Sequence, residues 1–138
     1  MPLIFSRILY YTRRITSWYR EAVSDTDIPY HMREMVLRDL ELGAIRVHIL
    51  YHAARGPIYG SWMARELERH GYRLSYGTLY PALHRMEEEG LLVREERVEG
   101  GRVRKYYTAT ERGLEELGRA RRIIRELYRE VVEGVEPG

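Results

Sequence analysis

A pair of glycines late in the chain constrains the fold more than any other feature. Gly100 and Gly101 separate two runs that lack the helical periodicity of the preceding residues, Leu91 to Val98 and Arg102 to Ala109. Two glycines supply the positive φ angles that a tight hairpin loop needs. The sequence therefore predicts two antiparallel strands joined by a two-residue loop. The register that this loop implies pairs Glu99 with Arg102, Val98 with Val103, Arg97 with Arg104, and Glu96 with Lys105.

Helical patterns surround the hairpin. Apolar residues at helical spacing predict a helix over Met32 to Ala54, which Gly56 and Pro57 end. A short helix is expected over Tyr59 to His70. A third helix begins near Ser75 and stops before Gly90. Within it Pro81 favours a regular start nearer Gly77 or Thr78, because proline is tolerated in a first helical turn. After the hairpin, Thr110 can cap a helix over Glu111 to Glu133.

This order predicts a mainly α fold with a small β-hairpin. We interpret it as a winged helix-turn-helix with dimerisation helices at its N- and C-terminal ends. The expected division is an N-terminal amphipathic extension over residues 1–30, the winged helix-turn-helix over 31–110 and a C-terminal dimerisation helix over 111–138. Three roles stay open for residues 1–23: an extension of the dimer interface, which we favour, contact with DNA, or contact with an anionic membrane.

Composition excludes several classes of protein. A chain of 138 residues fits one domain with an extension, and none of its stretches approaches the roughly 20 apolar residues of a membrane span. Cysteine is absent, so disulfides and thiolate chemistry are excluded. No nucleophile elbow, phosphate loop or metalloprotease motif occurs. We therefore expect neither an enzyme nor a cofactor, and we expect a cytoplasmic location.

Charge and amide content limit how the chain can recognise DNA. The net charge is only +2, so a DNA-binding surface must come from local arrangement of basic residues. All but one of the 23 basic residues are arginine, and Asn and Gln are absent. Those two amides are the side chains that bind adenine bidentately. We therefore expect modest base readout with a large contribution from DNA backbone and shape. The missing amides are typical of heat-adapted proteins and can equally reflect coding bias.

Several motifs together resemble the PadR-type regulators. Gly56 to Gly60 is similar to the G-x-x-Y-G entry to their second helix, and Ser75 to Leu83 to their S-x-G-T-L-Y-P-x-L third helix. Glu89 to Leu92 and Gly101 to Tyr107 resemble the turn into the wing and its return strand. Thr110 to Gly113 matches the T-x-x-G start of the last helix. The resemblance spans residues 36–132 and implies a dimeric transcriptional regulator, usually a repressor.

The resemblance also implies where DNA binds. The third helix would enter the major groove with its first residues facing the bases. Tyr80 either presents its hydroxyl there or packs in the core. In the wing, the predicted pairing of Arg97 with Arg104 is repulsive, and either a phosphate or the diagonal Glu95 or Glu99 could relieve it. The expected DNA-binding residues are Tyr59, Gly60, Ser61, Ser75, Tyr76, Gly77, Thr78, Tyr80, Arg85, Arg97, Arg102, Arg104 and Lys105.

The last helix is too long and too apolar along one stripe for a single small domain, so we expect it to pair with a second copy. Part of the stripe can also pack within its own chain. The expected interface residues are Ile8, Ile15, Trp18, Leu117, Ile123, Ile124, Leu127, Tyr128 and Val131. PadR-type regulators often bind flat aromatic ligands near this interface, so an aromatic effector is a candidate partner. Trp18, Tyr19 and Trp62 could stack on it, although core packing is the simpler interpretation.

One pattern suggests metal binding. His48 and His52 are four residues apart on the first predicted helix, and Glu41 lies about two turns earlier. Two imidazoles and a carboxylate can bind zinc, but surface or interface histidines are the plainer interpretation, and we assign no metal site.

The predicted function is sequence-specific transcriptional regulation, most simply repression, by a homodimer that binds a pseudo-palindromic operator on double-stranded DNA. Two alternatives stay open. One is a winged-helix module that binds proteins and not DNA, and the other is a membrane-associated regulator acting through residues 1–23.

Overall fold

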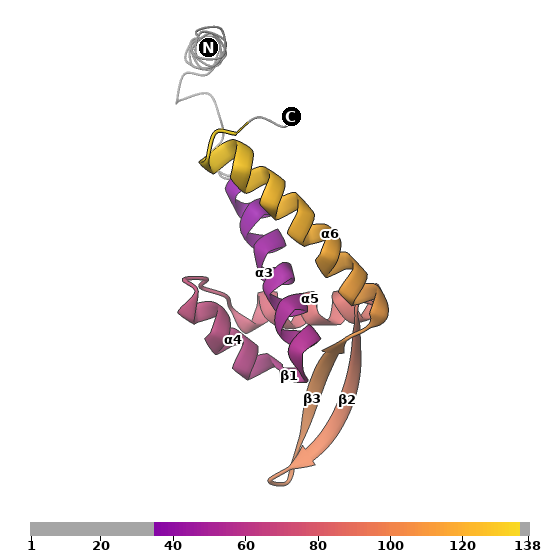
Figure 1. Cartoon of the computed structure of the whole chain (residues 1–138). Helices are drawn as coiled ribbons and strands as arrows, with labels where there is room; N and C mark the ends of the chain where they lie inside the picture. Colours follow the sequence, from indigo (N-terminus) through magenta and orange to yellow (C-terminus); the bar gives the residue numbers. More distant parts are fainter. Residues whose placement is uncertain (1–34, 136–138) are drawn as a thin grey trace, which may run out of the picture. The chain divides into compact units, whose positions relative to one another are not determined.

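The computed structural model of the chain describes residues 35–135. The predicted N-terminal helix, with Ile8, Ile15 and Trp18, lies outside these residues. None of the described helices is both long and apolar enough to span a membrane. The elements are α3 (Met35–Arg55), β1 (Ile58–Tyr59), α4 (Gly60–Arg69), α5 (Tyr76–Glu88), β2 (Leu92–Glu99), β3 (Arg102–Ala109), α6 (Glu111–Leu127) and the short π-helix η1 (Tyr128–Val132) (Figure 1).

The sheet contains three strands and not the expected two. The strand order is β1-β3-β2, and both neighbouring pairs are antiparallel. The hairpin has the predicted register, from Glu99 opposite Arg102 onwards, with Gly100 and Gly101 at φ angles of 57° and 76°. The additional strand arises because Tyr59 pairs with Tyr106, and this pairing holds its backbone extended. The helix expected from Tyr59 therefore begins one residue later.

Helix α5 begins earlier than predicted. Its first residue is Tyr76, so Pro81 lies inside the helix and not in its first turn. The peptide nitrogens of Thr78 and Leu79 both donate to the carbonyl of Ser75, at 3.0 and 3.1 Å, so the first turn forms before the proline. Leu79 and Leu83 are fully buried. Packing of this face offsets the hydrogen bond that proline cannot make.

The core lies where α3, α4 and α5 meet the base of the sheet. Its largest fully buried side chains are Ile49, Met63, Leu67, Leu79, Leu83 and Met86. The start of α6 is fixed to this core by Thr110, which caps the helix as predicted: its hydroxyl accepts from the N–H of Gly113 at 3.0 Å and donates to the carbonyl of Gly90 at 2.6 Å. A Cβ at Gly113 would overlap the carbonyl oxygen of Leu91, so the chain packs closely here.

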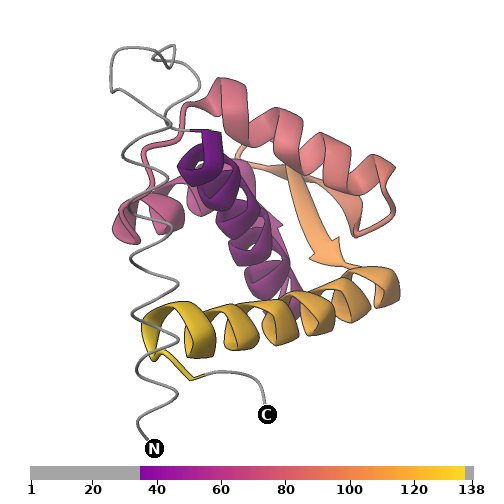
Figure 2. The same cartoon turned by 90° about the horizontal axis from the view of Figure 1, so that it is seen from above.

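Helix α3 lies between α4 and α6 in both views (Figures 1 and 2). Only the first turns of α6 enter the core. Leu117 is 4% exposed and packs inside its own chain, so it is unavailable as the interface residue that we expected. From Arg121 onwards the described residues of α6 and η1 are exposed. Regular α-helix ends at Leu127, and the expected last turns to Glu133 are π-helical through Val132.

Candidate nucleic-acid interface

A groove of about 520 Å³ lies between the wing, the start of α4 and the middle of α5. Strand β1 pairs only with Tyr106 and Tyr107 of β3, so the outer part of β3, residues 102–105, has a free edge on this side. The groove is lined by Tyr59, Gly60, Ser61, Tyr80, His84, Arg94, Arg102, Val103, Arg104, Lys105 and Tyr107. Its walls thus carry four permanent cations and several hydroxyl groups, with no carboxylate among the lining residues.

The start of α4 contacts the side chain of Tyr80 directly. A Cβ placed on Gly60 would lie 2.7 Å from a ring carbon of Tyr80 and 2.9 Å from its hydroxyl oxygen. Glycine at this position therefore lets the ring lie against the backbone. Tyr80 is 46% exposed, and its ring stacks on that of Tyr76 with 5.8 Å between centroids. Of the two interpretations of Tyr80, the structure favours the partly exposed one.

The N-terminus of α5 presents small polar groups to solvent. Ser75, Tyr76, Gly77 and Thr78 are all exposed, and the Ser75 and Thr78 hydroxyl oxygens lie 3.2 Å apart. A Cβ on Gly77 would meet only the Ser75 hydroxyl, at 3.6 Å, so the space beside this backbone is open. Backbone exposed in this way can come close to a nucleic acid. The four residues therefore form the accessible end of the expected recognition helix.

Of the two ways to relieve the repulsion between Arg97 and Arg104, phosphate or carboxylate, the structure shows carboxylate partners within the wing. Arg97 and Arg104 are opposite one another as predicted, but Arg97 pairs with Glu95 at 3.2 Å and Arg104 pairs with Glu99 at 3.1 Å. Each guanidinium also lies over a tyrosine ring, that of Tyr106 or Tyr59, at 4.4 and 4.3 Å from the ring centre. The diagonal carboxylates thus relieve the repulsion, and no phosphate is needed to explain it.

Two other wing cations are better placed for an anionic partner. Arg102 and Lys105 line the groove, are exposed and make no ion pair with any described residue. Arg85, in contrast, pairs with Glu89 at 3.3 Å and does not line the groove. Arg97 also lies outside the groove lining. Seven of the thirteen expected residues are therefore brought together here: Tyr59, Gly60, Ser61, Tyr80, Arg102, Arg104 and Lys105.

Sequence reasoning missed three polar residues of the groove, His84, Arg94 and Tyr107. Arg94 pairs with Glu87 at 3.4 Å across the junction of α5 and β2. Arg94 pairs with Tyr107 in the sheet register, so it lies on the helix-facing side of the wing. The hairpin register predicted from the sequence already implied this pairing. Burial raises the pKa of Tyr107, so its phenol stays neutral and can donate a hydrogen bond.

The three helices and the wing define a winged helix-turn-helix protein. A family model described as the transcriptional regulator PadR-like family matches residues 49–119. A transcriptional regulator of Mycobacterium tuberculosis, Rv3488, is 52% identical over 98 residues, which cover 71% of this chain and 92% of the relative. The chain belongs to the PadR-like family, and it is a transcriptional regulator and not an enzyme.

Solved structures agree with this assignment. A PadR family regulator from Eggerthella lenta superposes with a TM-score of 0.64 at 30% identity, covering 78% of this chain and 96% of that one. A PadR-like transcription factor from Bacteroides fragilis gives a TM-score of 0.62 at 29% identity, with 72% and 98% coverage. The resemblance inferred from the sequence motifs is therefore confirmed.

Proposed function

We propose that the chain is a homodimeric repressor that binds a pseudo-palindromic operator through the N-terminus of α5 and the groove beside the wing. The observation that carries the proposal is the placement of Arg102 and Lys105, unpaired among the described residues, in a groove that the middle of α5 also lines through Tyr80. Phosphate contacts from such cations position a protein on the duplex, and a helix end supplies contacts to base edges.

The exposed half of α6 supports the dimer. Ile123, Ile124 and Val131 are 66%, 49% and 70% exposed, and Leu127 and Tyr128 are also exposed. An apolar stripe of this kind is typical of a surface that a partner covers. A second copy is the simplest partner, because two-fold homodimers are the commonest oligomers and use the same surface of both copies.

Release by a small aromatic ligand would act through α6. A cavity of about 530 Å³ lies between α3, α4 and α6, and Val47, Tyr51 and Ile124 line its apolar part. A flat aromatic effector could bind there and alter the packing of α6. Trp62 lies 5.3 Å from His52 between ring centres and does not line this cavity.

The salt dependence of DNA binding tests the proposed interface. The affinity for a labelled operator, found by genomic footprinting, is measured by fluorescence anisotropy over a range of salt concentrations. Each phosphate contact contributes about 0.9 to the slope of log K against log salt. Arg102→Ala and Lys105→Ala should each weaken operator and random DNA alike, and each substitution should flatten this slope by about one unit.

The exposed Arg129 of η1 supplies the matched control, and Arg129→Ala should leave both affinity and slope unchanged. An unaltered slope in both groove variants would refute contact between DNA and the wing. Transcription in vitro from the footprinted promoter tests the sign of regulation, because a repressor lowers the transcript yield as it is added.

A further inference from the structure

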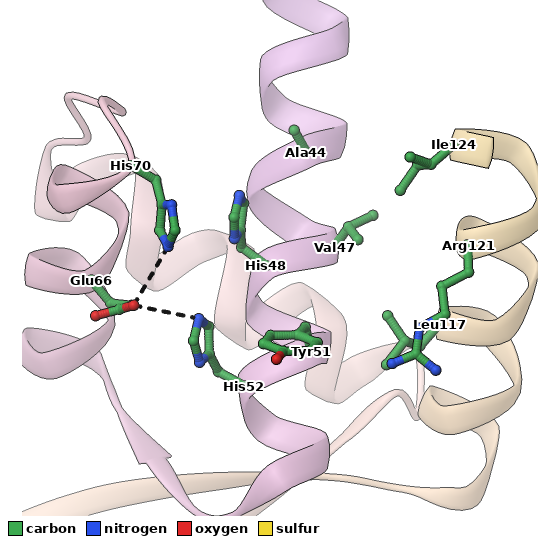
Figure 3. A pocket seen from close by; sticks show the side chains of 10 residues that line it. All are labelled: Ala44, Val47, His48, Tyr51, His52, Glu66, His70, Leu117, Arg121 and Ile124. Atoms are coloured by element: carbon green, nitrogen blue, oxygen red, sulfur yellow. Dashed lines mark ion pairs between the residues drawn. The ribbon is translucent and has the colours of Figure 1, made fainter. Parts of the chain in front are cut away.

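A cluster of four side chains on α3 and α4 lies outside the proposed DNA interface. His48 and His52 are four residues apart on α3, and Glu66 and His70 are four residues apart at the end of α4. Residues at this spacing lie on one face of a helix. The two helices therefore present a pair each to a common point (Figure 3).

The distances within the cluster are close to those of a metal centre. The ring nitrogens of the three histidines that face one another lie within 4.8 Å. Oε1 of Glu66 is 3.5 Å from Nε2 of His70 and 3.8 Å from Nε2 of His52. Two ligand atoms bound to one tetrahedral zinc ion, at about 2.0–2.1 Å each, are separated by roughly 3.3 Å. The separations among the three imidazoles, and those of Glu66 from His52 and His70, exceed this value by at most about 1.5 Å.

Hydrogen bonding within the cluster does not account for this convergence. Separations of 3.5 and 3.8 Å are longer than those of N–H···O hydrogen bonds. The other carboxylate oxygen of Glu66 is held by Arg69 at 3.1 Å, which leaves Oε1 directed at the imidazoles. The side chains of His52 and Glu66 are only 16% and 15% exposed, so their orientation is set by packing.

We propose that these four side chains, three imidazoles and one carboxylate, bind a single divalent transition-metal ion of the zinc type. Imidazole nitrogen is a good ligand for zinc, cobalt, nickel and copper. An ion bound here would form coordinate bonds to the imidazoles, which already lie close together. The ion would join α3 to α4, and α4 precedes the proposed recognition helix.

The protonation state of the cluster suits this role. Burial, assisted by the neighbouring imidazoles, lowers the pKa of His48, and burial likewise lowers that of His52. Both rings are therefore neutral at pH 7, and neutral imidazole is the form that binds a metal. Arg121 lies on the opposite wall of the cavity, on α6, across from Glu66 (Figure 3).

Titration of the full-length, tag-free protein with Co²⁺ tests the proposal, since cobalt reports its coordination through visible absorption. We expect one Co²⁺ per chain, with the absorption of a four- or five-coordinate ion, and displacement by Zn²⁺. His52→Ala, His70→Ala and the isosteric Glu66→Gln should each weaken binding at least about tenfold. At 100 times its dissociation constant, Zn²⁺ should raise the Tm of the wild type by about 5 °C or more.

His84 provides the matched control. It is an exposed histidine on α5 whose Nε2 lies 3.2 Å from Oε1 of Glu88, but it faces no other imidazole. His84→Ala should bind Co²⁺ as the wild type does. Binding that never saturates, or that is unchanged in His52→Ala and Glu66→Gln, would overturn the proposal. DNA binding without metal is measured separately, so a failure here leaves the proposed repressor function standing.

Discussion

Two glycines of the proposed DNA interface have different roles: we expect one to be needed for packing and the other for contact with DNA. Gly60 is buried against the ring of Tyr80, whereas Gly77 faces open space at the start of α5. Gly60→Ala should lower the free energy of unfolding by about 1–3 kcal/mol, because the new methyl group displaces the ring. Gly77→Ala should keep or raise stability by about 0.5 kcal/mol, since alanine favours helix over glycine.

Gly77→Ala should lose affinity for DNA even though it keeps its stability. Although Gly77→Ala folds well, its methyl group stands between the backbone and DNA, and operator binding should weaken roughly tenfold, about 1.4 kcal/mol. Urea unfolding and anisotropy on the same preparations measure both quantities. Wild-type affinity in Gly77→Ala would show that this backbone does not approach the duplex.

The pH dependence of stability should report the histidines of the cluster. Because the pKa of His48 is lower in the folded chain than the usual 6.5, the unfolded chain binds more protons between the two values. Stability from this group is therefore complete above about pH 6.5 and is lost as the pH falls through the folded pKa. In metal-free buffer, His48→Gln should show a smaller fall in Tm between pH 7 and pH 5 than the wild type. Equal falls would contradict the lowered pKa.

Among individual residues, the sequence predicts most reliably where local geometry decides the outcome. The register of Glu99 opposite Arg102 follows from a two-glycine loop, and the Thr110 cap follows from its place before a helical run. The sequence alone could reveal only two of the four proposed metal ligands. His48 and His52 share a helix, but Glu66 and His70 join them through the packing of α4 on α3, which no local pattern encodes. Glu41, the carboxylate that the sequence pattern placed two turns before these histidines, is exposed and outside the cluster.

At the scale of elements, α6 depends on its first turn. The Thr110 hydroxyl makes two hydrogen bonds, one to the start of α6 and one to the turn before the wing. Thr110→Ala should lower the free energy of unfolding by about 1–2 kcal/mol. Thr110→Ser keeps the hydroxyl and should lose much less. Denaturant midpoints of the two variants measure the difference, and equal losses would assign the effect to the methyl group.

The far half of α6 should instead determine assembly. Ile124→Glu places a charge on the exposed stripe, and we expect it to convert the dimer to a monomer at micromolar concentration. The fold should persist, because the core around Ile49 and Met63 forms without this part of α6. Val98→Glu is the matched control, since Val98 is 76% exposed but lies in the wing. Sedimentation velocity measures the mass, and a monomeric wild type or a dimeric Ile124→Glu would exclude this interface.

Elements that depend on long-range pairing were the ones that sequence patterns misplaced. Strand β1 has two residues, too few to show periodicity, and it exists because β3 offers its edge to Tyr59. Helix α5 begins at Tyr76, which places Pro81 inside the helix, where proline alone would be unfavourable. The burial of Leu79 and Leu83 offsets that cost. In both cases tertiary contacts outweighed local propensity.

The affinity of the dimer for DNA should depend on the spacing of the two half-sites relative to the helical repeat. If two copies pair through α6, their α5 helices address half-sites about 34–36 Å apart, roughly 10–10.5 base pairs. Five base pairs inserted between the half-sites turn one of them to the opposite face of the duplex. Wild-type affinity should then fall at least about tenfold, whereas the same insertion outside the half-sites should have no effect. Ile124→Glu should bind both DNAs weakly and equally, because a monomer contacts one half-site at a time. A wild-type protein indifferent to the central insertion would show that the two recognition helices are not rigidly joined.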